Sequence, residues 1–85
     1  MIKEILMPRL SENMQEGILS AWLKKEGEKI KEGEPLFEIL TDKAAFEVES
    51  PLTGTIEKII VQASPDKNIP VGFILAYINT GKVDK

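Results

Sequence analysis

The sequence predicts an all-β domain, a flattened barrel or sandwich of two sheets with about four strands each. Glycine and proline turn signals recur along the chain, and short apolar runs lie between them. The second half of the chain also repeats the apolar and glycine pattern of the first. Hydrophobic residues make up 42% of the 85 residues and charged residues 29%, which suits a single small globular core.

The apolar runs predict strands, in chain order, at residues 18–23, 36–40, 45–48, 55–61 and 73–78. The first run is ambiguous, because Leu19, Trp22 and Leu23 also have the spacing of one helix face. Gly27 argues against a helix through this region, since a glycine inside a helix costs about 1 kcal/mol relative to alanine. We therefore expect a strand here too.

An internal repeat supports strands in both halves of the chain. The segment that starts at Gly17 aligns with the segment that starts at Gly54, 37 positions later. The aligned apolar and glycine positions are Leu19 with Ile56, Trp22 with Ile59, Leu23 with Ile60, Ile30 with Ile69, Gly33 with Gly72, Leu36 with Leu75 and Ile39 with Ile78. Two similar halves predict quasi-two-fold symmetry, with these apolar side chains filling the space between the sheets.

The composition excludes several classes of function. The chain has no cysteine and no histidine, so it lacks the usual nucleophile, general base and zinc ligands. We expect no catalytic residue and no metal site. The formal net charge of −3 disfavours a nucleic-acid partner. No apolar run has the length of a membrane span and the N-terminus lacks signal-peptide anatomy, so we expect an intracellular chain with no membrane partner.

A tight hairpin is predicted at the middle of the chain. Residues 35–40 and 45–49 are two strand-like runs. The segment that joins them is Thr41-Asp42-Lys43-Ala44. Asp42 favours a turn, because an aspartate side chain can hydrogen-bond the backbone nearby. Lys43 then lies at or next to the tip. A lysine in a turn is ordinarily a solvated charge, so the turn alone assigns Lys43 no special role.

Six motifs follow one another along almost the whole chain. They are Met7-Pro8-Arg9-Leu10-Ser11-Glu12-Asn13-Met14-Gln15-Glu16-Gly17, residues 22–30, Gly33-Glu34-Pro35-Leu36, Thr41-Asp42-Lys43-Ala44, Ser50-Pro51-Leu52-Thr53-Gly54 and Ile69-Pro70-Val71-Gly72. Taken in this order, they resemble the lipoyl domain of the dihydrolipoyl acyltransferases of 2-oxo acid dehydrogenase complexes. The first motif looks most like the pyruvate and acetoin dehydrogenase branches. Several spaced motifs in one order are far more specific than any one of them.

The resemblance implies a flattened β-barrel of the barrel-sandwich type with quasi-two-fold symmetry, in agreement with the repeat. It implies that Lys43 carries lipoic acid in amide linkage. The flanking residues implied to shape the turn and to be recognised by the modifying enzyme are Thr41, Asp42 and Ala44. Residues 8–15 are implied to form a loop that joins the first two strands beside the hairpin and helps the decarboxylase to choose its carrier. The partner contacts expected in this loop are Arg9, Glu12 and Asn13.

The function implied by the resemblance is that of a swinging-arm carrier of acyl groups and electrons, not of an enzyme on its own. The lipoyl group would accept an acyl group from a thiamin-dependent 2-oxo acid decarboxylase, deliver it to coenzyme A in the acyltransferase core and be reoxidised by dihydrolipoyl dehydrogenase. A lipoyl ligase or lipoyl transferase would attach it. We expect a monomeric domain over residues 1–79, with a polar tail or linker at 80–85, in the bacterial cytoplasm or, in a eukaryote, the mitochondrial matrix.

The chain departs from the family pattern at two places. Leu40 stands where many members have glutamate, and we expect it to alter recognition by a partner or by the modifying enzyme. Residues 63–68 replace a Glu-Gly-Asp turn, and we expect them to alter only a distal loop. Two alternatives stay open. One is a biotinyl carrier domain, whose lysine typically lies between two methionines rather than between Asp42 and Ala44. The other is an unmodified β-sandwich interaction module.

Overall fold

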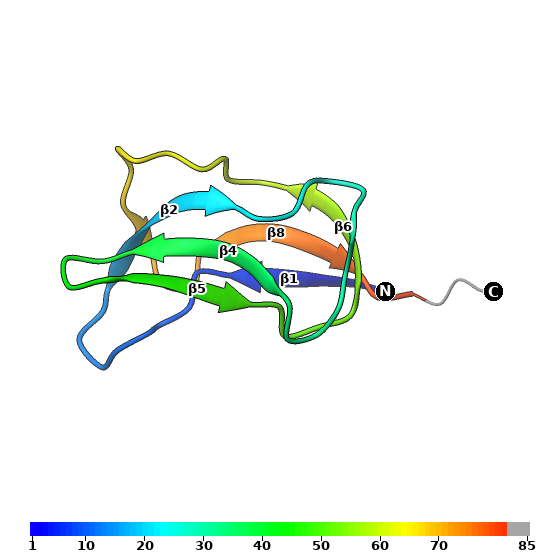
Figure 1. Ribbon diagram of the computed structural model, residues 1–85, viewed down its shortest axis with the longest axis horizontal. Helices are drawn as coiled ribbons and strands as arrows, with labels where there is room; N and C mark the ends of the chain where they lie inside the picture. Colours follow the sequence, from blue (N-terminus) through cyan, green and yellow to red (C-terminus); the bar gives the residue numbers. More distant parts are fainter. Residues whose placement is uncertain (82–85) are drawn as a thin grey trace.

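The computed structural model describes residues 1–81, and every regular element within this range is a β-strand (Figure 1). The strands are β1 (Ile2–Leu6), β2 (Glu16–Trp22), β3 (Lys29–Ile30), β4 (Pro35–Leu40), β5 (Ala45–Glu49), β6 (Gly54–Ile59), β7 (Ile69–Pro70) and β8 (Ile74–Asn79). The apolar runs predicted β2, β4, β5, β6 and β8. They missed β1, and they also missed β3 and β7, which have two residues each and leave no periodic pattern. None of the described residues forms a helix long and apolar enough to cross a membrane.

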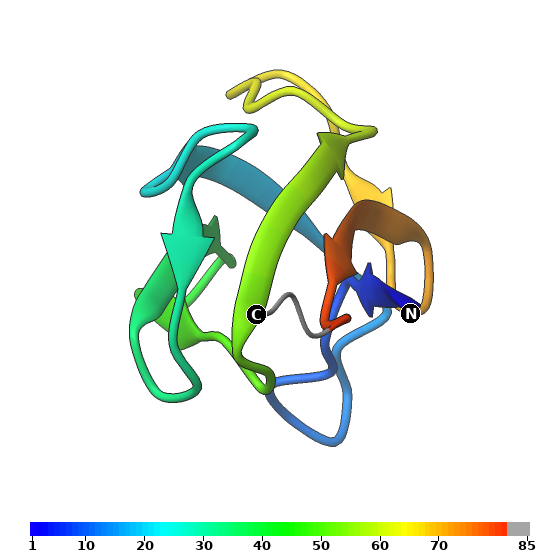
Figure 2. The ribbon, with the colours of Figure 1, turned by 90° about the vertical axis from the view of Figure 1, so that its right-hand side faces the viewer.

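The strands form two four-stranded antiparallel sheets. One has the order β1-β8-β6-β3 and the other the order β5-β4-β2-β7. Viewed from the side that faces right in Figure 1, the strands enclose a central space (Figure 2). The predicted all-β fold of two sheets with about four strands each is therefore confirmed.

The two halves of the chain occupy equivalent places in this fold. Exchanging β1 with β5, β2 with β6, β3 with β7 and β4 with β8 converts the strand order of one sheet into that of the other. The pairing register is also repeated, since Leu40 opposite Ala45 corresponds to Asn79 opposite Ile2. Gly33 and Gly72 both have φ of 92°, in the left-handed region that favours glycine. The predicted quasi-two-fold symmetry is confirmed.

The core lies between the sheets and contains most of the aligned apolar residues. Its buried members are Ile5, Met7, Met14, Leu19, Ile30, Leu36, Phe37, Ile39, Ile56, Ile69, Leu75, Ala76 and Ile78. Leu23 and Ile60 were wrongly placed there. They are 43% and 42% exposed, because β2 and β6 end one residue earlier and the chain turns outward. Trp22 lies at the edge of the core, where its indole N–H donates a 2.8 Å hydrogen bond to the Val61 carbonyl.

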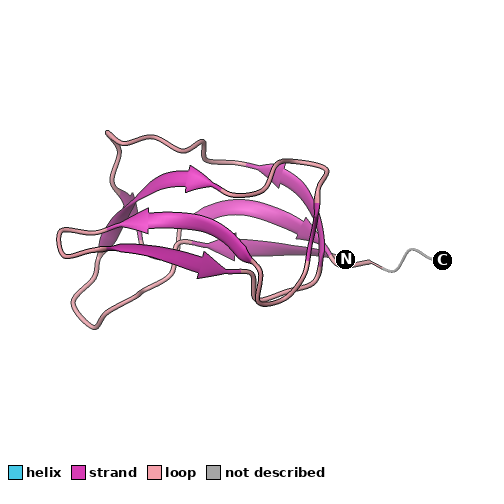
Figure 3. Ribbon diagram, viewed as in Figure 1, coloured by secondary structure: helices cyan, strands magenta, loops and turns pink. Residues whose placement is uncertain are grey.

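Met1 and Thr80 lie side by side at the opposite end of the molecule from the β4–β5 turn (Figure 3). The backbone N–H of Thr80 donates to the Met1 carbonyl at 2.8 Å, and the Thr80 hydroxyl donates to the same oxygen at 3.3 Å. By the two-fold relation this contact is the counterpart of the β4–β5 turn. Residues 82–85 of the predicted tail lie outside the described residues, so the division at residue 79 stays a prediction.

Candidate functional site

A four-residue turn connects β4 to β5 and carries Lys43 at the end of the hairpin. The last strand pair is Leu40 opposite Ala45, and the Thr41 N–H donates to the Ala44 carbonyl at 2.9 Å. Lys43 is exposed. Among the described residues its ammonium group forms no ion pair; the ion pair found there joins Lys24 and Glu34 at 3.9 Å. The hairpin therefore presents a primary amine to solvent at the end of a hydrogen-bonded strand pair.

The Thr41 side chain organises this turn. Its hydroxyl oxygen accepts hydrogen bonds from the backbone N–H groups of Lys43 and Ala44, both at 3.2 Å, and its hydroxyl hydrogen is donated to the Ala44 carbonyl, also at 3.2 Å. The sequence interpretation had given this role to Asp42, and that was wrong. Within residues 1–81 the Asp42 carboxylate accepts no hydrogen bond from the turn. Threonine as the first residue of a turn is itself a turn signal, and Thr41 is one of the flanking residues that the resemblance implied to shape this turn.

Thr41→Val is expected to loosen the turn while the domain stays folded. Valine keeps the side-chain shape but removes the oxygen that accepts from two amides, at a cost of about 1 kcal/mol. Amide hydrogen exchange at Lys43 and Ala44, followed by NMR, should therefore become about fivefold faster. Thr41→Ser keeps the hydroxyl and is the matched control. Unchanged exchange in the valine variant would contradict the assignment.

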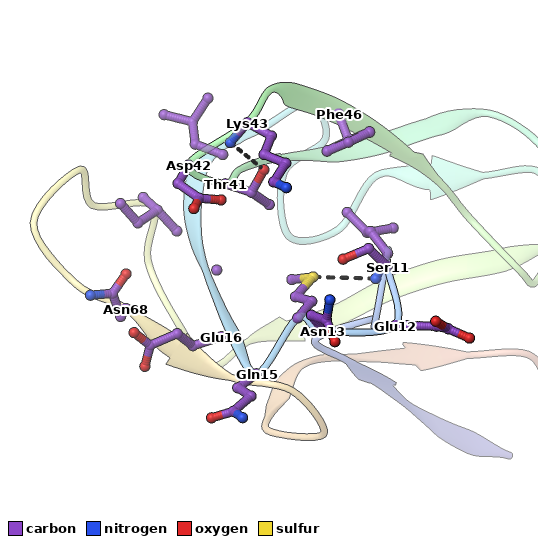
Figure 4. A pocket seen from close by; sticks show the side chains of 15 residues that line it. Ser11, Glu12, Asn13, Gln15, Glu16, Thr41, Asp42, Lys43, Phe46 and Asn68 are labelled. Atoms are coloured by element: carbon purple, nitrogen blue, oxygen red, sulfur yellow. Dashed lines mark hydrogen bonds between the residues drawn. The ribbon is translucent and has the colours of Figure 1, made fainter.

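The hairpin faces the loop of residues 8–15 across an open hollow of about 830 Å³. Figure 4 shows the Lys43 side chain extending over this hollow toward the loop, with Asn13 and Ser11 on the far side. Thr41, Asp42 and Lys43 line it from the hairpin, as predicted for the turn. The predicted partner residues Glu12 and Asn13 line it from the loop. Hairpin and loop are therefore neighbours, as the resemblance implied.

Arg9 is placed differently from the other two predicted partner residues. It does not line the hollow. Its guanidinium Nη1 donates to the backbone carbonyls of Met14, at 2.9 Å, and Glu12, at 3.3 Å. The Leu10 N–H donates to the Met14 sulfur at 3.2 Å, and the Met14 N–H donates to the Ser11 carbonyl at 3.2 Å. The Arg9 side chain is thus bonded within the loop itself.

The segment that departs from the family pattern is not distal to this site. Asn68, at the end of residues 63–68, lines the same hollow as Lys43, and Figure 4 shows it on the side of the hollow opposite Phe46. The expectation of a remote loop was wrong, because the backbone N–H of Ser64 bonds the Leu19 carbonyl at 2.9 Å and holds the segment beside β2. Leu40, the other departure, also lines the hollow.

Phe46 is a further lining residue that sequence reasoning did not select. It shares one face of β5 with Val48, which packs against the core, and it pairs with the buried Ile39. At the end of the hairpin this inner face opens to solvent, and the Phe46 side chain is 39% exposed beside Lys43. The described residues contain no group of three or more histidine, cysteine, aspartate or glutamate side chains placed to hold a metal ion.

Comparison with known proteins places this geometry in a family. The family described as "Biotin-requiring enzyme", which covers biotin and lipoyl domains, matches residues 3–78. The dihydrolipoyllysine-residue acetyltransferase component of the Rickettsia prowazekii pyruvate dehydrogenase complex is 48% identical over 82 residues, 96% of this chain and 20% of the relative. The corresponding component of the Pseudomonas putida acetoin cleaving system is 36% identical over 84 residues, 99% of this chain and 22% of the relative.

A solved structure gives the same result. The lipoyl domain of the 2-oxoglutarate dehydrogenase complex from Azotobacter vinelandii is 29% identical and superposes with a TM-score of 0.73, covering 93% of this chain and 98% of that domain. The chain spans about a fifth of the length of the curated relatives, but it matches the solved lipoyl domain over nearly its whole length. The chain therefore belongs to the biotin/lipoyl family, and within that family it is a lipoyl domain.

Proposed function

We propose that this domain carries lipoic acid in amide linkage on Lys43 and serves as the swinging-arm carrier of a 2-oxo acid dehydrogenase complex. The observation that carries the proposal is the exposed Lys43 amine at the end of a hairpin whose turn is fixed by Thr41. The amine is exposed and forms no ion pair among residues 1–81, so the position fits a covalently attached group. When bound, lipoic acid supplies a dithiolane that takes up an acyl group and two electrons.

The residues of the chain have three tasks in this function. Lys43 provides the nitrogen of the amide and loses its positive charge when the amide forms. A neutral arm enters a buried partner site without the desolvation cost of an ammonium group. Thr41 and the β4–β5 pairing keep the base of the arm in one orientation, so that the arm rather than the domain does the moving.

The names of the relatives suggest the chemistry that this carrier serves. They are components of a pyruvate dehydrogenase complex and of an acetoin cleaving system. The partners we propose are a thiamin-dependent decarboxylase that loads the acyl group, an acyltransferase core that passes it to coenzyme A, dihydrolipoyl dehydrogenase and a lipoyl-attaching enzyme. Weak docking to each partner suffices, because tethering within a complex raises the effective concentration of the carrier.

The first test is the intact mass of the chain after incubation with a lipoyl ligase, lipoate and ATP. We expect a gain of one lipoyl group. A parallel reaction with a biotin ligase, biotin and ATP should leave the mass unchanged, because Lys43 lies between Asp42 and Ala44 rather than between methionines. Biotin incorporation without lipoylation would replace the proposal with a biotinyl carrier. No gain in either reaction would favour an unmodified β-sandwich interaction module.

A further inference from the structure

The loop of residues 8–15 is the place where the two halves of the domain differ most in length. Nine residues, 7–15, connect β1 to β2, whereas the two-fold equivalent connection from β5 to β6 has four residues, 50–53. The flanking backbone still obeys the symmetry. The Gly72 N–H donates to the Met7 carbonyl at 2.9 Å, as the Gly33 N–H donates to the Ser50 carbonyl at 2.8 Å. The longer β1–β2 connection therefore adds a wall to the hollow at the lysine end of the molecule.

The Arg9 side chain cross-links this added wall through hydrogen bonds within the loop. Arg9 is the only arginine of the chain, and its Nη1 reaches two carbonyls that lie three and five residues further along. Hydrogen bonds from a charged donor are stronger than neutral ones, and the planar guanidinium fixes their direction. The Met14 carbonyl is partly buried, so it gains a partner in a place where water has limited access. These two bonds hold residues 12–14 as a short arc.

Met14 connects the arc to the sheet. Its side chain is 7% exposed, and its sulfur accepts the Leu10 N–H. Its terminal methyl lies 2.9 Å from the position that a Cβ on Gly17 of β2 would take, so the methionine packs directly on the strand. Glu12 and Asn13 lie on the exposed side of the arc and line the hollow opposite Lys43 (Figure 4). Their position therefore depends on bonds that Arg9 makes behind them.

We propose that Arg9 is a positioning residue that sets the shape of the loop at residues 8–15 and thereby the fit of the lysine end to its decarboxylase. The inference rests on the proposed carrier function and revises the direct partner contact expected for Arg9. Arg9 acts through Glu12 and Asn13, which meet the partner while its own guanidinium stays bonded to the loop. The Arg9 bonds stay within the loop and involve no residue of the β4–β5 turn, so we expect Arg9 to affect loading by the decarboxylase and not attachment of the cofactor.

The test compares Arg9→Ala and Arg9→Lys with the wild-type chain after lipoylation. Each is presented to the decarboxylase component of a pyruvate dehydrogenase complex and to that of an acetoin cleaving system, with the matching substrate, and acyl transfer to the domain is followed by mass. Lysine keeps the charge but lacks the fork that bridges two carbonyls. Lys67→Ala removes a positive charge from the segment next to Asn68 and is the matched control for net charge.

Both Arg9 variants should raise the KM for the lipoylated domain by about tenfold, the scale of one lost hydrogen bond to a charged group, with kcat within about twofold. The NMR amide signals of Leu10 and Met14 should shift, while those of the strands stay in place. The rate of lipoylation and the behaviour of Lys67→Ala should match the wild type. A merely structural role for Arg9 would instead lower the melting temperature and the lipoylation rate together.

Three results for the Arg9 variants would overturn the inference. An unchanged KM in Arg9→Ala would show that the loop shape does not matter to the partner. A raised KM with unshifted Leu10 and Met14 signals would show that Arg9 touches the partner directly. A wild-type KM in Arg9→Lys would show that the charge alone counts. A lipoylated wild-type domain that neither component acylates would overturn the proposed carrier function as well, and this outcome is recognisable before any variant is compared.

Discussion

Lys43→Arg should lose lipoylation completely and keep the fold. Arginine retains the length and charge of the side chain, but its guanidinium stays protonated and is not a nucleophile for amide formation. The Lys43 side chain is exposed and forms no ion pair within the described part of the chain, so its replacement removes no stabilising contact. Intact mass after the ligase reaction measures the loss, and a thermal melt within about 2 °C of the wild type checks the fold.

Lys67→Arg is the matched control for this substitution. Lys67 is also exposed and lies next to Asn68, which lines the same hollow, so it shares the surroundings of Lys43 without sharing the hairpin. It should be lipoylated like the wild type. If Lys43→Arg still gained a lipoyl group, the attachment site would lie elsewhere, and peptide mapping of the modified chain would locate it.

Among single glycine-to-alanine substitutions within the strands, Gly54→Ala should cause the largest loss of stability. A Cβ on Gly54 would lie 2.5 Å from the Asn79 carbonyl oxygen and 2.8 Å from the Ile78 Cγ2. The carbonyl belongs to the neighbouring strand β8 and cannot rotate away, so the sheet itself must shift. Overpacking of this kind costs about 3 kcal/mol, which in a domain of this size lowers the melting temperature by about 12 °C or more.

The internal symmetry provides the control for this prediction. Gly17 is the aligned glycine of the first half, and a Cβ there would meet the Met14 terminal methyl at 2.9 Å and the Ile39 Cγ2 at 3.0 Å. Both are ends of side chains, and the methionine has three rotatable bonds with which to give way. Gly17→Ala should therefore cost only about 1 kcal/mol. Equal melting temperatures for the two alanine variants would contradict this explanation.

The fold could be predicted from the sequence because the apolar and glycine pattern that defines it is local and occurs in both halves of the chain. Leu36 and Leu75 are both buried, and Gly33 and Gly72 share one backbone conformation, so each half confirms the reading of the other. The apolar pattern missed β1, β3 and β7, and it also ran past the ends of two strands that it did predict. Leu23 and Ile60 continue the apolar run by one residue, and only the paired structure shows that the strand has already ended.

The candidate site was less accessible, because its walls come from segments far apart in the chain. The hairpin with Lys43 could be predicted from turn chemistry and resemblance. The inward bonding of Arg9 and the approach of Asn68 to the hollow could not, since they depend on where two long connections fold back. The assignment of the turn's hydrogen bonds to Asp42 instead of Thr41 failed for a different reason. Both residues favour turns, and only the geometry decides which side chain reaches the backbone amides.

The meeting of Met1 with Thr80 has a mechanical consequence for any chain joined to these ends. Tension from such a chain is first borne by the β1–β8 pair and the bonds beside it. That pair belongs to one sheet, whereas the hairpin that carries Lys43 belongs to the other and points to the opposite end of the molecule. Tension applied through a chain joined to Met1 or Thr80 would therefore not pass through the lysine hairpin, and the Thr41 turn would keep its shape.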